Sequence, residues 1–258
     1  MKAIRYHEYP SAGASPRTLA RTAGALYLVN ILAGAFAIGL VPAMLAAPDV
    51  AATARNIQDH ELLYRLGLAA HILVTVTNVP MAVIFYDLFK VVNRRLALLD
   101  AALILVATSI EAAGLLSQYL PLVLLGSAHY SSIPPAQLHA LAYLPGDLAT
   151  ADYRIYTVFY GFDIACVAYL VLRSTFLPSA VAALLAVDAL AYLFGGFAGL
   201  LAPGFAAHLT PWINLPAPLG EGTFCLWLLL AGVNATQWRK QARAATQALD
   251  PGAAMGGL

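Results

Sequence analysis

Four polar or acidic side chains lie at similar depths in four different apolar segments of the sequence, namely Asn78, Glu111, Asp163 and Asp188. Each lies roughly 15–18 Å from one end of its segment, at ~1.5 Å of rise per helical residue. The hydrocarbon core of a bilayer is ~30 Å thick, so all four would fall near its middle. Ionisable groups there are costly and face a partner or a wet cavity. We therefore expect a binding or acid–base site at this depth.

Further polar residues accompany these four at helical spacing. Residues three, four or seven apart share one face of a helix. The resulting stripes are His71, Thr75 and Asn78; Glu111, Gly114 and Gln118; Tyr156, Tyr160 and Asp163; and Asp188 with Tyr192. We predict catalytic roles for Glu111, Asp163 and Asp188. Ligand-binding roles are predicted for His71, Asn78, Gln118, Tyr156, Tyr160, Tyr192 and Glu221.

Each acidic residue allows a functional and a structural interpretation. Glu111 is either a proton-handling group or a neutral acid that holds helices together by a hydrogen bond. Asp163 and Asp188 lie in consecutive segments, and if they approach each other, one should hold a proton because two close carboxylates repel. That arrangement serves general acid–base chemistry, whereas the alternative is two separate, satisfied aspartates. His71 is either a packing residue or a proton relay with Glu111 or Glu221.

The composition is that of a polytopic membrane protein. The 258 residues are 61% hydrophobic and 10% charged, with a mean hydropathy of +0.75, whereas soluble domains carry about 25% charged residues. A net charge of +1 without long basic runs argues against nucleic-acid binding. Cys166 and Cys225 lie in apolar segments and are interpreted as small buried residues. No metal site is predicted, and no cofactor is indicated.

The apolar segments predict an all-α fold with six transmembrane helices, because only helices or closed barrels span lipid. The predicted spans are Ala23–Leu45, Leu66–Phe89, Asp100–Leu125, Tyr153–Leu172, Leu177–Leu201 and Pro218–Trp238. Residues 21–238 would form one transmembrane domain. Residues 1–20 and 239–258 would form a cytoplasmic N-terminal segment and a cytoplasmic C-terminal tail.

Positive charge sets the expected orientation. With the N-terminus inside, eleven of the 14 lysines and arginines fall on the cytoplasmic side, and only Arg55, Arg65 and Arg154 fall outside. Both termini are therefore expected in the cytoplasm. The inner connections would be the short segments Val91–Leu99 and Arg173–Phe176. The outer ones would be Pro48–Arg65, Ser131–Asp152, which includes a short helical stretch to Leu144, and Pro203–Pro216.

The polar stripes run from the outer surface to the middle of the membrane and stop there. At the inner surface we expect Tyr86, Asp87 and Asp100 to interact with the nearby basic residues Lys90, Arg94 and Arg95. The rest of the inner half has few polar side chains. This asymmetry predicts an outward-facing pocket rather than a channel, and such a pocket suits an amphiphilic ligand with one polar end.

The chain resembles the bacterial membrane family called "domain of unknown function 4386" over roughly Arg21 to Val233. The likeness depends on five short motifs. They are residues 21–28 (RTAGALYL), 63–67 (LYRLG), 92–99 (VNRRLALL), 176–178 (FLP), and Gly220-Glu221 with residues 226–229 (LWLL). The resemblance implies a six-helix membrane protein and places Glu111 and Glu221 at family positions. It supplies no activity.

Three functions are compatible with these features. The first is binding or acid–base transformation of a lipophilic small molecule, such as an isoprenoid, a quinone or a lipid. The second is a small proton-coupled transporter, and the third is a structural or accessory membrane subunit whose polar groups only hold helices together. The lipid bilayer is the expected partner in each case, and the bacterial cytoplasmic membrane is the expected location.

Overall fold

Long helices make up nearly all of the structure. This computed structural model describes residues 15–130 and 132–249, and no strand occurs within those ranges. Residues 1–14 and 250–258, which hold most of the predicted N-terminal segment and the end of the predicted tail, lie outside the described residues. The elements are α1 (Pro16–Gly34), η1 (Ala35–Leu40), α2 (Val41–Leu45), α3 (Val50–Asp59), α4 (Glu61–Gln118), α5 (Leu120–Gly126), η2 (Ala128–Tyr130), α6 (Pro135–Arg173), α7 (Ser179–Leu201), α8 (Pro203–Ile213), α9 (Pro216–Leu230) and α10 (Ala235–Leu249).

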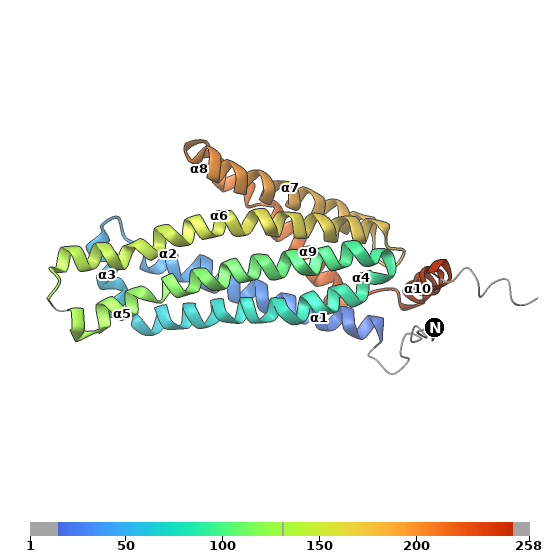
Figure 1. Cartoon of the computed structure of the whole chain (residues 1–258), viewed down its shortest axis with the longest axis horizontal. Helices are drawn as coiled ribbons and strands as arrows, with labels where there is room; N and C mark the ends of the chain where they lie inside the picture. The colour runs from blue at the N-terminus through green and yellow to red at the C-terminus, as the bar shows by residue number, and fades with distance from the viewer. Residues whose placement is uncertain (1–14, 131, 250–258) are drawn as a thin grey trace, which may run out of the picture.

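The element α4 is a hairpin of two antiparallel arms. Its helical dihedral angles break at Asn93, with φ −154° and ψ 105°, and the chain reverses there (Figure 1). The Asn93 side chain accepts a hydrogen bond from the backbone N–H of Leu96 at 3.1 Å, which caps the second arm. Near the other end, the Tyr64 hydroxyl donates to the Gln118 carbonyl at 2.6 Å and ties the arms together. The predicted connection Val91–Leu99 is thus a sharp turn within otherwise helical residues.

The helices run back and forth between two ends of an elongated body. One end carries α3 and α5, and the other carries α10 and the reversal of α4 (Figure 1). We name these the α3 end and the α10 end. The continuous helical stretch of α1, η1 and α2 runs from the α10 end to the α3 end. The first arm of α4 runs back to the α10 end. The second arm of α4 then runs to the α3 end, and α6 runs back to the α10 end. The helices α7 and α9 complete the bundle.

Two predicted helix boundaries are wrong. The helix predicted to begin at Tyr153 begins at Pro135 and continues through Pro145. Proline lacks one backbone hydrogen bond, but this part of α6 packs against α3 and α5, and that packing supports it. The helix predicted to end at Trp238 ends at Leu230, because Gly232 has a left-handed φ of 69° and the chain bends by 100° into α10.

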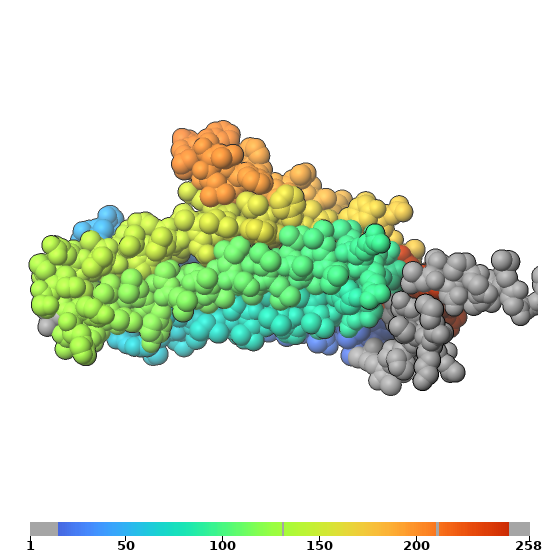
Figure 2. All heavy atoms as spheres, viewed as in Figure 1, coloured from blue at the N-terminus to red at the C-terminus, as the bar shows by residue number. Residues whose placement is uncertain are grey.

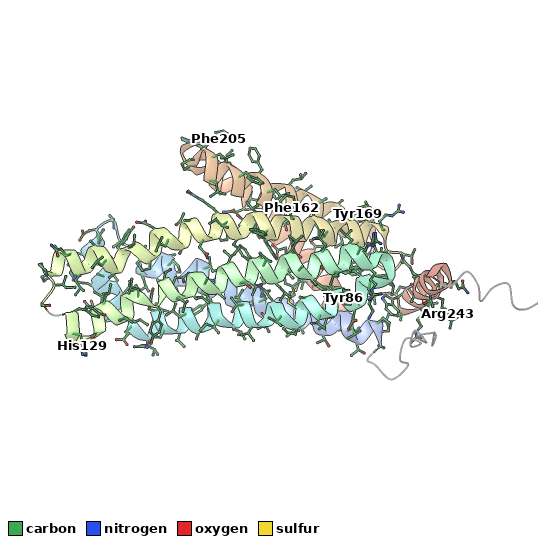
Figure 3. The ribbon with its side chains drawn as sticks, viewed as in Figure 1. Tyr86, His129, Phe162, Tyr169, Phe205 and Arg243 are labelled. Carbon is green, nitrogen blue, oxygen red and sulfur yellow. The ribbon has the colours of Figure 1, made fainter. Side chains whose placement is uncertain are left out.

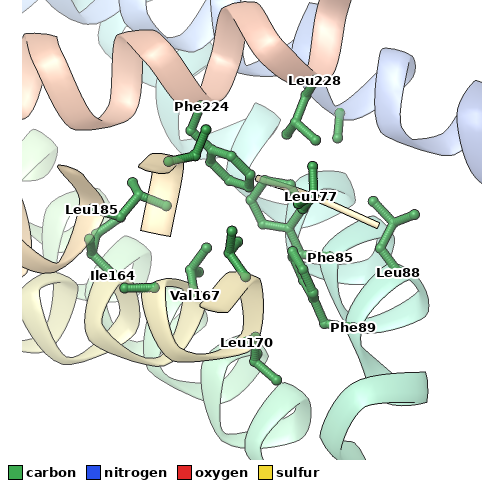
Figure 4. Close-up of a cluster of buried hydrophobic side chains, with 14 of the residues drawn as sticks. Phe85, Leu88, Phe89, Ile164, Val167, Leu170, Leu177, Leu185, Phe224 and Leu228 are labelled. Carbon is green, nitrogen blue, oxygen red and sulfur yellow. The ribbon is translucent and has the colours of Figure 1, made fainter. Parts of the chain in front are cut away.

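A group of aromatic rings lies within the largely aliphatic core, toward the α10 end. Phe85 and Phe89 of α4 meet Phe224 of α9 and Phe176, with ring centroids 5.6 Å apart for Phe85 and Phe224 and 6.1 Å apart for Phe89 and Phe176 (Figure 4). Leu185 and other aliphatic side chains from α6 and α7 complete the cluster. This core joins α1, α4, α6, α7 and α9 into one unit.

The outer surface of the bundle is also apolar. Phe162 and Tyr169 of α6 and Phe205 of α8 point away from the body and are about half exposed (Figure 3). The space-filling view shows α8 projecting from the side of the bundle (Figure 2). Large exposed apolar side chains on so many helices fit a lipid environment rather than water.

Among the described residues, four helical stretches are long and apolar enough to cross a membrane. They are Pro16–Leu45, Glu61–Gly126, Pro135–Arg173 and Ser179–Leu201, and the bent pair of α9 and α10 would make a fifth if it counts as one span. The stretch Glu61–Gly126 includes both arms of α4. These helices support the prediction of an all-helical, multi-pass membrane protein.

The crossing of α1 and α9 gives a packing test. A Cβ atom on Gly24 would lie 2.5 Å from the backbone nitrogen of Leu229, so no side chain fits there without separating the helices. We expect Gly24→Ala to lower the free energy of unfolding by about 1–3 kcal/mol. Gly34→Ala in the same helix is the control, since its Cβ would meet only Val74 at 3.8 Å. Thermal unfolding in detergent measures both, and equal stabilities would contradict the close approach.

Candidate functional site

The principal cavity lies toward the α3 end of the bundle. It has a volume of about 500 Å³, within the ~300–1,000 Å³ of ligand pockets. Residues of η1, α2, α3, both arms of α4, α5 and α6 form its walls. Most of the wall is aliphatic. Its polar side chains include Tyr64, Tyr143, Tyr153 and Tyr156 with His71, Glu111, Gln118, Asp147 and Asp152.

A histidine–glutamate pair closes the inner end of this cavity. His71 is the deepest lining residue on the first arm of α4, and Glu111 is the deepest on the second arm. The His71 Nε2 and Glu111 Oε1 atoms are 3.0 Å apart, and both side chains are buried. The second oxygen, Oε2 of Glu111, is buried without a hydrogen-bond partner. The pair therefore leaves one buried oxygen without a hydrogen bond in a residue that lines the cavity.

α6 contributes an acid and a row of aromatic rings to the same cavity. Asp152 is half-buried and lies against Gly114 of the second arm of α4, where a larger residue would displace it. Tyr153 stacks on Tyr156, and Tyr156 stacks on Tyr160 with ring centroids 5.2 Å apart. Tyr156 lines the cavity, whereas Tyr160 is buried behind it. The row thus leads from the cavity into the next polar cluster.

That cluster is a carboxylate held by three tyrosines. The hydroxyls of Tyr27 and Tyr160 donate to Glu221 Oε2 at 2.6 and 2.5 Å, and the Tyr192 hydroxyl donates to Oε1 at 2.7 Å. An ionised carboxylate accepts through both oxygens, so the three donors suit that form. Glu221 is the sixth residue of α9 and is buried.

A second acidic cluster joins α4 to α6. The carboxyl groups of Asp100 and Asp163 interact with each other, and both side chains are buried. Two neighbouring buried carboxyl groups share at least one proton, because close like charges disfavour double ionisation. The expectation that Asp100 forms a surface ion pair is wrong, since it faces α6 inside the bundle. Asp87 does pair with Lys90, at 2.5 Å, and the Arg94 Nε donates to Tyr86 at 3.4 Å.

Asn78 occupies a third environment beside this pair. Its amide nitrogen donates to Thr108 Oγ1 at 3.0 Å, and its carbonyl oxygen accepts from Asn30 at 2.8 Å, so it links α1 to both arms of α4. Asn78, Asp163, Tyr160 and Tyr27 also border a cavity of about 20 Å³. A buried water needs ~10–15 Å³ and two to four polar partners. This cavity therefore matches one water molecule between the two acidic clusters.

Asp188 does not join Asp163. Its side chain lies against Gly220 of α9, where an added Cβ would meet the Asp188 Cβ at 3.0 Å. Neither carboxyl oxygen of Asp188 has a hydrogen-bond partner, although the side chain is buried. Asp163 interacts instead with Asp100 of α4, so the Asp163–Asp188 pair that the sequence suggested is not formed.

The predicted site residues therefore divide into separate environments. The large cavity gathers His71, Glu111, Gln118 and Tyr156; the tyrosine–carboxylate cluster gathers Tyr160, Tyr192 and Glu221; and Asn78 lies near Asp163. The sequence analysis missed Tyr27, Tyr64, Asp100, Asp147 and Asp152. A helix continued through Pro145 would have placed Asp152 on the Tyr156 face, four residues away. Within the described ranges, no group of three histidine, cysteine or acidic side chains could hold a metal ion.

Comparison with known proteins identifies a family. A family model described as "Domain of unknown function (DUF4386)" matches residues 22–232, which is most of the chain. Neither the curated proteins nor the solved structures contain a match. The matched range begins in α1 and ends just after α9, so it contains the large cavity and both acidic clusters. The chain is a member of the DUF4386 family, as its opening, turn and α9 motifs suggested.

Proposed function

We propose that this protein is a six-span membrane protein that binds a lipophilic small molecule in the large cavity. The two arms of α4, with α1–α2, α6, α7 and α9, supply the six spans. An even number of spans leaves both termini on one side, and the positive-inside rule makes that side the cytoplasm. The cavity then opens outward, in a bacterial cytoplasmic membrane.

The observation that carries this proposal is the unpaired carboxyl oxygen of Glu111 beside a cavity whose wall is largely apolar. An apolar wall accommodates an isoprenoid, quinone or lipid chain, and the Glu111 Oε2 atom accepts a hydrogen bond from a polar end group. A buried acceptor left without a partner costs about 1–3 kcal/mol. Binding of a donor group therefore relieves a cost that the unliganded protein bears.

The His71–Glu111 pair also has the composition of an acid–base catalyst. An imidazole and a carboxyl 3.0 Å apart exchange a proton readily, and both contact the cavity. In the proposed reaction, Glu111 donates a proton to the polar end of the ligand and His71 then passes a proton to Glu111; in the opposite direction, Glu111 takes a proton from the ligand and passes it to His71. Asp163 and Asp188 lie outside this cavity and take no part in that step.

A cavity-filling variant tests binding. Ala149 lines the cavity, whereas Ala151, on the same turn of α6, is exposed and does not. We expect Ala149→Trp to abolish any lipophilic molecule that co-purifies in mild detergent, as measured by native mass spectrometry. The matched variant Ala151→Trp should retain it. Equal retention by both variants would remove the cavity as the binding site.

Glu111→Gln separates binding from chemistry in the same experiment. The amide keeps the shape of the side chain but cannot carry the proton. If the His71–Glu111 pair transforms the ligand, the molecule bound to Glu111→Gln should differ in mass from that bound to the wild type. If the variant and the wild type bind the same molecule and the variant binds less of it, the protein binds the ligand without transforming it. Unchanged occupancy and mass, with only lower thermal stability, would favour the structural-subunit hypothesis.

A further inference from the structure

The charged groups of the large cavity are acidic. Its described lining contains the carboxyl groups of Glu111, Asp147 and Asp152 and the imidazole of His71, and it contains no lysine or arginine. Clefts that carry one sign of charge between low-dielectric walls concentrate ligands of the opposite sign. Of these acids, only Glu111 contacts a basic side chain, through His71.

The arginines at the α3 end are held away from the cavity. Arg65 pairs with Glu61 at 2.6 Å on the surface, and Arg55 lies 3.9 Å from Asp49. The side chain of Arg154 lies beside Gly199 of α7, on the other side of α6 from Asp152. None of the three neutralises the cavity acids or provides a site for an anionic head group there.

The base of the cavity presents acceptors and aromatic faces. Glu111 is part of the lining, its Oε2 atom is buried without a hydrogen-bond partner, and Asp152 and Tyr156 come from the facing helix. A primary ammonium group has three N–H donors and no acceptor. It also binds favourably over a tyrosine ring. A carboxylate ligand would place its hydrogen-bond acceptors against the acceptors of Glu111 and Asp152. An alcohol would offer only one hydrogen-bond donor, compared with three for the ammonium.

We propose that the cavity selects a lipophilic amine in its ammonium form over the alcohol or carboxylate of the same chain length. This inference depends on the proposed ligand binding and specifies its polar end. The ammonium lies between Glu111 and Asp152, and its alkyl chain follows the aliphatic wall toward the α3 end. Asp152 is the residue that determines this preference, since Glu111 already shares its charge with His71.

Three probes of equal chain length test the preference. Dodecylamine, dodecan-1-ol and dodecanoate are titrated into full-length protein in zwitterionic phosphocholine nanodiscs. The readouts are displacement of a dansyl-labelled alkylamine and the shift in unfolding temperature. We expect the amine to bind about tenfold more tightly than the alcohol, which corresponds to 1.4 kcal/mol, and dodecanoate to bind most weakly.

Asp152→Asn should reduce the amine preference to about twofold and leave the affinity for the alcohol unchanged. Asp59→Asn is the matched control, because Asp59 is an exposed acid at the same end and does not line the cavity. It should retain the preference. Equal binding of amine and alcohol would overturn the charge selection and leave the binding function intact. Failure of all three probes, together with no effect of Ala149→Trp on co-purified molecules, would overturn both.

Discussion

Replacing Glu221 with alanine is expected to lower the free energy of unfolding by about 2–5 kcal/mol. Its two carboxyl oxygens accept hydrogen bonds from Tyr27, Tyr160 and Tyr192, which come from α1, α6 and α7. Bonds between membrane helices contribute ~0.6–1.7 kcal/mol each, and the variant loses three at once. It also leaves buried phenol groups without an acceptor. Unfolding in a mixed-detergent titration, followed by circular dichroism, measures the change.

Two milder variants separate the causes. Tyr192→Phe removes a single bond and should cost about 0.6–1.7 kcal/mol. Glu221→Gln keeps one oxygen for Tyr27 and Tyr160 but turns an amide N–H₂ toward Tyr192. Its loss of stability should therefore lie between those of Tyr192→Phe and Glu221→Ala. If Glu221→Ala is as stable as the wild type, Glu221 does not hold α9 against the other helices.

Asp163→Ala is expected to destabilise the protein by about 2–4 kcal/mol. The carboxyl of Asp100, which is 1% exposed, would lose its partner in the interior and would lie beside a small new void. Asp163→Asn should be within about 0.5 kcal/mol of the wild type. Its amide donates to the Asp100 carboxylate in place of the shared proton, and the total charge of the pair stays the same.

The reciprocal variant Asp100→Asn should behave in the same way. Together the two asparagine variants test how many protons the Asp100 and Asp163 carboxyl groups hold. A marked gain in stability in either would mean that both aspartates are ionised in the wild type, because the substitution would then relieve charge repulsion. The same mixed-detergent titration applies, with Asp87→Asn at the surface as a control for the loss of one acid.

The lengths of the apolar segments and the helical spacing of their polar residues predict much of this fold. Five of the six predicted spans correspond to helical stretches, and the sixth is helical only as far as Leu230. A segment of ~20 apolar residues satisfies its backbone hydrogen bonds in lipid as a helix. The errors fall where local and tertiary preferences disagree. Pro145-Gly146 has the composition of a loop, yet packing against α3 and α5 keeps it helical. A single glycine such as Gly232 is often tolerated inside a helix, yet its positive φ ends this one.

The site was harder to predict than the helices. Spacing predicts which residues share a helix face, and it correctly placed His71 and Glu111 among buried groups. It does not predict which helix each face meets. Spacing therefore suggests Asp188, in the next segment, as one possible partner of Asp163, whereas the structure brings Asp100 of the α4 hairpin to it. Partners between helices depend on rotations and vertical shifts that one sequence does not record.

The length of α6 determines how the cavity can be reached. At ~1.5 Å per residue, its 39 residues span about 58 Å, nearly twice the ~30 Å hydrocarbon thickness. Most lining residues of α6, between Ala142 and Tyr156, lie in the half nearer the α3 end. If the other half of α6 crosses the bilayer, as the six-span proposal implies, the half that lines the cavity would stand largely in the head-group layer and the water beyond it. We then expect membrane-impermeant labels added on that side to reach the cavity without crossing the bilayer.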